Sequence, residues 1–164
     1  MLNLKKLRAA PDRPHEIDES YESFTHESFS LEGRAIVRGE AVYRQNAIWV
    51  RLRIEATVSQ ACSRCLAPVI SAVRLDELLE FRPLHAVENP LATEVYLYDI
   101  EETVLDLQPY VMGLIANSLA IKPLCRPDCK GLCPQCGQDL NVTTCDCERK
   151  APGDPRFKVL EKLL

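Results

Sequence analysis

Long apolar runs are missing from this sequence of 164 residues, and no stretch approaches the roughly 18 residues that a membrane-spanning helix needs. The first residues also lack the apolar core of a secretory signal, so we expect a cytoplasmic protein. The sequence contains no internal repeat, no low-complexity linker, no glycine-rich phosphate loop, no H-E-x-x-H motif and no nucleophile elbow. None of the three histidines lies near the cysteines. These absences exclude a membrane span and leave no recognisable catalytic motif.

Charged residues are plentiful but unevenly distributed around a formal net charge of -4. Residues 34–75 carry seven arginines and only two glutamates, whereas residues 76–121 carry nine acidic residues and a single arginine. The overall negative charge argues mildly against a nucleic-acid partner. The basic block can nevertheless form a local basic surface on an acidic protein.

Alternating apolar residues predict antiparallel strands in the first two thirds of the chain. The dipeptide Gln45-Asn46 is typical of a hairpin tip between two of them. Weak periodicity at the N-terminus predicts an arm with one or two edge strands. The expected strands are residues 35–43, 48–58, 69–81 and 94–99, and the arm is residues 1–30.

Helical periodicity is clear only over residues 107–119. Asp106 is a natural N-cap for this helix, Pro109 suits its first turn, and Lys122-Pro123 should end it. A shorter helix is expected over residues 155–164. The predicted fold is therefore α+β: an antiparallel sheet with one main packed helix, then a cysteine-rich, zinc-ribbon-like C-terminal module. We expect the sheet domain over residues 1–124 and the module, packed on it, over residues 125–164.

Eight cysteines are many for a reducing compartment, where a disulfide framework is unfavourable. Six of them fall within 23 residues, which a set of buried apolar thiols does not explain. Metal binding is the better interpretation, because closely spaced thiolates can complete the tetrahedral shell of a structural zinc ion. The predicted ligands are Cys62, Cys65, Cys125, Cys129, Cys133, Cys136, Cys145 and Cys147.

Eight thiolates form two four-ligand zinc sites, and the spacing favours one pairing. In it Cys133, Cys136, Cys145 and Cys147 form one site, and the other four cysteines join the module to the end of a strand. The alternative groups Cys125, Cys129, Cys133 and Cys136 in one site. An iron–sulfur cluster and a thiol–disulfide redox pair at Cys62-Ser-Arg-Cys65 are the rival interpretations. An all-thiolate shell leaves no open position for water, which argues against catalysis at the metal.

Three groups of residues resemble one family. They are Cys62-Ser-Arg-Cys65-Leu after a long strand, the helix start at Asp106-Leu107, and the stretch from Leu119 through Cys125, Cys129 and Cys133-Pro-Gln-Cys136-Gly to Asn141. Asp154-Pro-Arg-Phe157 follows them. The chain resembles the YceD family of large ribosomal RNA subunit accumulation proteins. This resemblance implies a non-enzymatic cytoplasmic factor that supports accumulation of large-subunit (23S) rRNA and has no small-molecule substrate.

The implied partners are rRNA or its precursor, a ribosomal protein, or both. RNA binding needs cations for phosphate and flat groups for stacking. A solvated sheet face with ordinary arginines is the alternative, in which Trp49 packs under the arm. The acidic block of residues 76–121 is typical of solvated surface, although it could meet a basic ribosomal protein. The candidate RNA-binding residues are Trp49, Arg51, Arg53, Arg44, Arg64 and Lys130.

Overall fold

The computed structural model describes residues 1–22, 25–86 and 95–147. Its elements are β1 (Leu2–Asn3), α1 (Leu4–Ala9), β2 (His15–Glu22), β3 (Thr25–His26), β4 (Phe29–Leu31), β5 (Arg34–Arg44), β6 (Ala47–Ala61), β7 (Pro68–Pro83), the 3-10 turn η1 (Leu84–Ala86), β8 (Tyr96–Tyr98), β9 (Val104–Leu105) and α2 (Gln108–Ser118). Among the described residues, strands therefore predominate over helices. The short helix predicted for residues 155–164 lies outside them.

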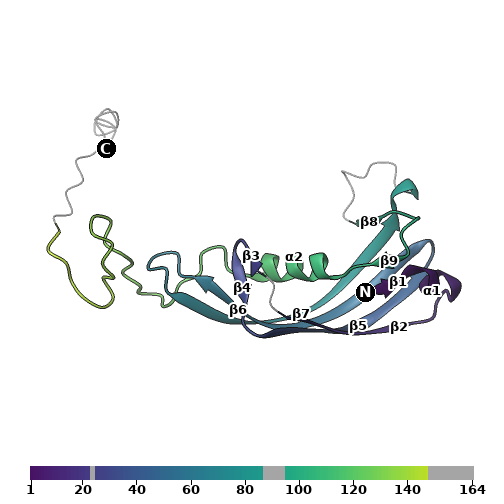
Figure 1. Cartoon of the computed structure of the whole chain (residues 1–164), viewed down its shortest axis with the longest axis horizontal. Coiled ribbons are helices and arrows are strands. Elements are labelled where there is room, and N and C mark those ends of the chain that lie inside the picture. Colours follow the sequence, from purple (N-terminus) through teal and green to yellow (C-terminus); the bar gives the residue numbers. More distant parts are fainter. Residues whose placement is uncertain (23–24, 87–94, 148–164) are drawn as a thin grey trace, which may run out of the picture.

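The long strand β6 is the centre of the main sheet, because both of its edges are paired (Figure 1). One edge of β6 pairs antiparallel with β5 and, beyond the N-terminal end of β5, with β4. The other edge of β6 pairs antiparallel with β7. β2 extends the sheet outward from β5, and β8 joins β7 in parallel through residues 81–83. The predicted antiparallel sheet is thus present, with one parallel pair added among the described strands.

The hairpin between β5 and β6 turns at the predicted dipeptide. Gln45 and Asn46 both have positive φ, 52° and 58°, and the flanking residues Arg44 and Ala47 are paired. Two consecutive positive φ values are what a two-residue hairpin turn requires. The alternation predicted for residues 48–58 is also observed, because the residues between its buried members are exposed or half-buried; the buried members are Ile48, Val50, Leu52, Ile54, Ala56 and Val58.

The core lies between the buried face of the sheet and α2, which runs along the concave side of the bowed sheet (Figure 1). α2 contributes Val111 and Ile115 to this core. Tyr110 packs edge-on against Phe81 of β7, with 4.9 Å between the ring centroids. The opposite, convex face of the sheet is therefore open to solvent.

Two features of the helices differ from the sequence prediction. α1 was not predicted, although its Leu4 and Leu7 are buried in the core. α2 begins at Gln108 and ends at Ser118, short of Lys122. The N-cap is Leu107 and not the predicted Asp106, although the Oδ1 of Asp106 accepts a hydrogen bond from the backbone N–H of Gln108, the first helical residue, at 3.0 Å.

The cysteine-rich segment, residues 125–147, lies beyond the turn that joins β6 to β7, at the end of the molecule opposite α1 (Figure 1). In its described residues the chain forms turns and one isolated β-bridge, between Leu132 and Asp139. The ribbon architecture of the module therefore remains a prediction.

Candidate metal centres and the open sheet face

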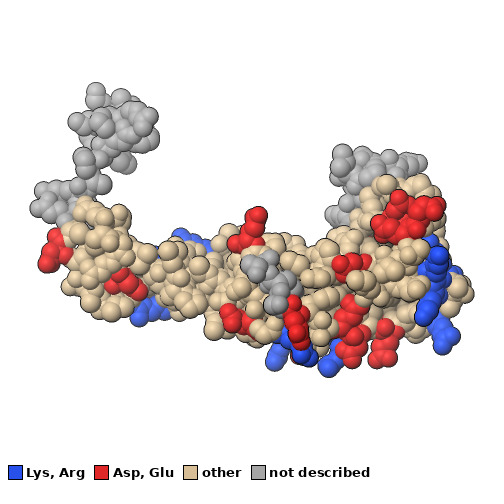
Figure 2. Space-filling model, viewed as in Figure 1, with Lys and Arg blue, Asp and Glu red and all other residues tan. Residues whose placement is uncertain are grey.

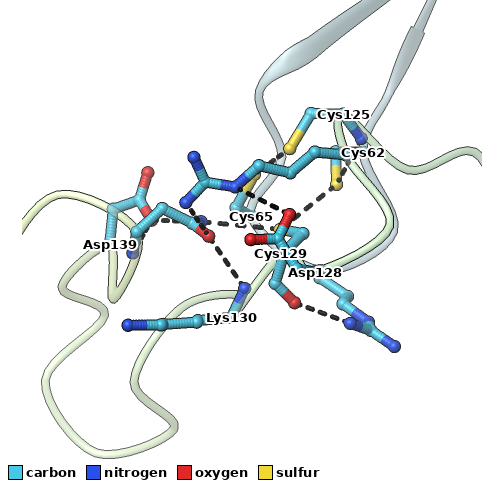
Figure 3. A network of polar contacts seen from close by, with 10 residues as sticks. Cys62, Cys65, Cys125, Asp128, Cys129, Lys130 and Asp139 are labelled. Carbon is cyan, nitrogen blue, oxygen red and sulfur yellow. Dashed lines mark hydrogen bonds and ion pairs between the residues drawn. The ribbon is translucent and has the colours of Figure 1, made fainter.

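Four cysteine thiols converge where the β6–β7 turn meets the chain that follows α2 (Figure 3). Cys62 and Cys65 lie in the turn, and Cys125 and Cys129 come from the cysteine-rich segment. The Sγ atoms of Cys62 and Cys129 are 3.9 Å apart, those of Cys65 and Cys125 are 3.6 Å apart, and all four lie within 4.8 Å of one another. Four thiolates around one zinc ion, with bonds of about 2.3 Å, have sulfurs roughly 3.8 Å apart. These four cysteines, the proximal tetrad, have the spacing of a tetrathiolate metal site.

The other four cysteines form a second cluster further from the sheet, which we call the distal tetrad. Its members are Cys133, Cys136, Cys145 and Cys147, and their Sγ atoms also lie within 4.8 Å of one another. Cys133 is buried, Cys145 and Cys147 are half-buried, and Cys136 is exposed. The structure thus groups the eight thiols in the favoured pairing and not in the alternative one. All eight are free thiols.

Each tetrad includes one backbone turn, and the two turns have the same hydrogen-bond pattern. In the first turn the N–H of Leu66 donates to the carbonyl of Cys62 at 2.9 Å, and the N–H of Cys62 donates to the carbonyl of Ala67 at 2.8 Å. In the second, the corresponding bonds join Gly137 to Cys133 and Cys133 to Gln138, both at 2.8 Å. The residue after the second cysteine has φ +63° at Leu66 and +74° at Gly137. This repeated geometry points backbone N–H groups at the sulfurs, as in structural metal sites.

The two turns lower the pKa of one thiol in each tetrad. Backbone N–H groups, that of Arg64 foremost, lower the pKa of Cys62 to about 6. The N–H groups of Cys136 and Gln135 do the same for Cys133. By contrast, desolvation of its sulfur raises the pKa of Cys125 to about 12. A metal ion would therefore find one ready thiolate in each tetrad and would displace protons from other thiols.

Hydrogen bonds made by Arg64, which is not itself a ligand, support the proximal tetrad. The Arg64 guanidinium donates from Nη1 to the carbonyl of Cys129 at 2.6 Å, and the Arg64 carbonyl accepts from the N–H of Leu132 at 3.1 Å. Gly131 has φ +78°, and a Cβ there would lie 3.0 Å from the Arg64 carbonyl oxygen. Arg64, predicted as an RNA ligand, is therefore engaged in fixing the cysteine-rich segment to the β6–β7 turn.

The other predicted RNA-binding residues are divided between two regions. Four of them lie on strands and point to the open sheet face: Trp49, Arg51 and Arg53 of β6, and Arg44 of β5. Lys130 lies beside the proximal tetrad (Figure 3), where Arg64 contacts Cys129. A groove of about 520 Å³ on the open face is lined by Arg38, Arg51, Arg53 and neighbouring carboxylates. The six residues are therefore not brought into one site.

The arginines of the open face are paired with carboxylates. Arg51 contacts Asp76 at 2.9 Å and Arg53 contacts the same carboxylate at 3.4 Å. Arg44 contacts Asp12 at 2.6 Å. Figure 2 shows blue and red side chains interleaved along this convex side. The Arg51 guanidinium lowers the pKa of Asp76, so this carboxylate is ionised at neutral pH. The basic block of the sequence is thus largely neutralised where it reaches the surface.

A family comparison covers most of the chain, including both tetrads. Residues 50–164 match the model of the family described as large ribosomal RNA subunit accumulation protein YceD. The chain belongs to the YceD family. This membership confirms the resemblance drawn from the sequence motifs.

Relatives of this YceD-family chain occur in bacteria and in plants. It is 35% identical over 105 residues to an uncharacterised protein of Mycobacterium tuberculosis, covering 63% of this chain and 49% of that protein. A Mycobacterium leprae relative, also uncharacterised, is 30% identical over 105 residues, covering 63% of this chain and 43% of that protein. A chloroplastic YCED homolog 1 of Arabidopsis thaliana, named a large ribosomal RNA subunit accumulation protein, is 35% identical over 46 residues, or 28% of this chain and 14% of that protein. The chain thus spans about half the length of the mycobacterial proteins or less, and no solved structure matches it.

The structure adds one residue that the sequence analysis of this family member did not assign. Asn141, in the loop between Cys136 and Cys145, donates from Nδ2 to the Sγ of Cys129 at 3.5 Å. The only signal for Asn141 in the sequence is its position between two pairs of predicted ligands, Cys133 with Cys136 and Cys145 with Cys147. Among the residues that the structure describes, no helix is long and apolar enough to cross a membrane.

Proposed function

We propose that this chain is a non-enzymatic, cytoplasmic factor that supports accumulation of large-subunit rRNA. The match of residues 50–164 to the YceD model is the observation that carries this proposal. The plant relatives, which are named large ribosomal RNA subunit accumulation proteins, agree with it. A strain that lacks the protein should contain less 23S rRNA relative to 16S rRNA, and the full chain should restore the ratio. An unchanged ratio would refute the proposal.

Two structural zinc ions would stabilise the protein, one in each tetrad. The support is chemical: four thiolates at tetrahedral spacing satisfy zinc completely, and in these sites no ligand position is left for a substrate. The zinc would supply cross-links, with the proximal tetrad joining the module of residues 125–164 to the sheet domain of residues 1–124.

Metal analysis of protein purified without added metal tests the cofactor. We expect about two zinc ions per chain and a colourless solution. Brown, iron-containing protein would favour an iron–sulfur cluster, and a metal-free protein with a reversible disulfide at Cys62 and Cys65 would favour a redox protein. Either result would refute the zinc assignment without touching the rRNA measurement.

The open sheet face is the surface that we propose for contact with rRNA. Trp49 is half-buried there and offers a ring for base stacking, while Arg51 and Arg53 share the Asp76 carboxylate as their ion-pair partner. Phosphate could replace Asp76 as their partner. Lys130 and Arg64 would make a second, separate contact near the proximal tetrad.

Crosslinking to rRNA precursors tests this face. Arg51→Ala combined with Arg53→Ala should reduce crosslinking severalfold and leave thermal stability unchanged. Lys5→Ala combined with Lys6→Ala removes the same charge from exposed positions on α1 and should have no effect. Unchanged crosslinking in the arginine variant would point to a ribosomal protein as the partner.

A further inference from the structure

The two tetrads share one short stretch of chain. Cys129 belongs to the proximal tetrad and Cys133 to the distal tetrad, with three residues between them. The loop of the distal tetrad returns to this stretch, because the N–H of Leu140 donates to the carbonyl of Gly131 at 2.9 Å and Leu132 bridges with Asp139. The loop that the distal cysteines close is therefore held directly against the proximal tetrad.

Asn141 is the side chain through which this loop contacts a proximal cysteine. Its Nδ2 donates both to the Sγ of Cys129, at 3.5 Å, and to the Oδ1 of Asp139, at 2.6 Å. Its Oδ1 accepts from the N–H of Lys130 at 2.8 Å and from the Arg126 guanidinium at 2.8 Å. Figure 3 shows Asp139 and Lys130 on the side of Cys129 where this network runs. Every contact of the Asn141 amide therefore fixes its orientation toward one sulfur.

We propose that Asn141 couples the two metal sites, so that a metal ion in the distal tetrad strengthens metal binding in the proximal tetrad. The inference rests on the proposed function in one respect, namely that both tetrads bind metal. A distal ion closes the loop that carries Asn141 and so presents its N–H to Cys129. A hydrogen bond to a metal-bound thiolate stabilises that thiolate, and outer contacts of this kind typically change metal affinity by about 10- to 100-fold.

The coupling makes metal loading of the two tetrads cooperative. By thermodynamic linkage, the proximal ion must strengthen distal binding by the same factor. Partly loaded protein would therefore be disfavoured relative to the empty and fully loaded forms. Attachment of the module to the sheet would then depend on a metal ion bound on its far side.

A four-protein cycle tests the coupling. The zinc affinity of the proximal tetrad is measured by chelator competition in the full chain, with the distal tetrad intact or disabled by Cys145→Ser and Cys147→Ser, and with Asn141 or Asn141→Ala. Disabling the distal tetrad should weaken proximal affinity about tenfold or more when Asn141 is present. With Asn141→Ala the same change should have less than about a twofold effect.

Asn141→Asp separates a specific contact from a general loss of folding. Aspartate keeps an oxygen for Lys130 and Arg126 but replaces the N–H donor with a negative oxygen facing the Cys129 thiolate. An intact distal site should then weaken proximal binding, which reverses the sign of the coupling. Asn117→Asp, on the exposed side of α2, is the matched control and should leave both affinities unchanged.

The outcomes distinguish the inference from the function on which it rests. The coupling would be overturned if disabling the distal tetrad changed proximal zinc affinity equally with and without Asn141, or changed it in neither case. The proposal of two zinc ions per chain would still stand. A full chain that binds no metal would overturn both the coupling and the proposal that the tetrads bind metal. Asn141 variants that bind distal metal more weakly even when the proximal tetrad is disabled by Cys62→Ser and Cys65→Ser would also contradict the coupling, because Asn141 donates to no distal sulfur among the contacts described.

Discussion

At the scale of single residues, Gly39 is the position where the sheet tolerates no side chain. A Cβ at Gly39 of β5 would overlap the carbonyl oxygen of Arg51 on the neighbouring strand β6. Gly39→Ala should therefore destabilise the protein by about 2–3 kcal/mol, because the two central strands must separate. Gly113→Ala on α2 is the control, since a Cβ there meets nothing within 4 Å. It should stabilise the helix by about 0.5–1 kcal/mol. Denaturant unfolding checks both, and equal effects would contradict the prediction.

The two cysteine turns provide a second comparison at this scale. Gly137 takes positive φ without cost, whereas Leu66 takes the corresponding conformation with a side chain that is 66% exposed. Leu66→Gly relieves left-handed strain but gains chain entropy in the unfolded state, so we expect a change in stability within about 1 kcal/mol. Gly137→Leu introduces the strain and should cost about 1–2 kcal/mol. Chemical unfolding of the metal-loaded protein measures this asymmetry, and a larger loss at Leu66 would show that its side chain supports the fold.

At the scale of elements, the sequence predicts those parts whose burial alternates cleanly. β6 is buried on one face along its length, so its period of two is visible, and its hairpin tip carries two residues that accept positive φ. β2 is an edge strand in which only Ile17 is buried, and α1 buries only two leucines in six residues. Such short or half-exposed elements are stabilised by contacts with distant parts of the chain, which leave little periodicity in the local sequence.

The candidate sites show the same limit. Cysteine spacing predicted both tetrads, because the turn that brings two thiols together is local and the ligand chemistry is specific. The pairing of arginines with carboxylates was not predicted, because Arg51 and Asp76 are brought together only by the register of β6 and β7. Asn141 was missed for a similar reason, since its partner Cys129 lies in the other tetrad.

The register of β6 and β7 also leads to a prediction about the open face. Asp76→Asn would leave Arg51 and Arg53 without their shared anion. If rRNA binds this face, affinity should rise, and the slope of log K against log salt should steepen by about 0.7 for each phosphate newly contacted. Glu101→Gln, which removes an exposed charge elsewhere, should change neither quantity. Unchanged binding by Asp76→Asn would favour a protein partner for this face.

At the scale of the whole molecule, the proximal tetrad joins two parts that otherwise share few contacts. The sheet and α2 form the main core, whereas the buried proximal cysteines form a separate small cluster with Leu124, Leu132 and residues of the β6–β7 turn. A small apolar cluster of this kind stabilises little by itself. The orientation of the cysteine-rich segment on the sheet should therefore depend on metal, more than the fold of the sheet does.

Acidification should release the metal, and the pKa values of Cys62 and Cys133 determine the pH at which zinc affinity begins to fall more steeply. Cys62 and Cys133 have pKa values lowered to about 6, so between pH 6 and 9 metal binding displaces no proton from them. Below about pH 6 both are protonated in the metal-free protein, and each adds one proton to the competition at its site. The slope of log zinc affinity against pH should thus increase by about one at each tetrad as pH falls through 6. The stability that these lowered pKa values give the metal-free protein is complete above about pH 9, the ordinary thiol pKa, and is lost as the pH falls from there to about 6. Chelator competition across pH 5–8 measures the slope. A slope that stays constant through pH 6 would show that the backbone N–H groups of the two turns do not hold these thiolates ionised.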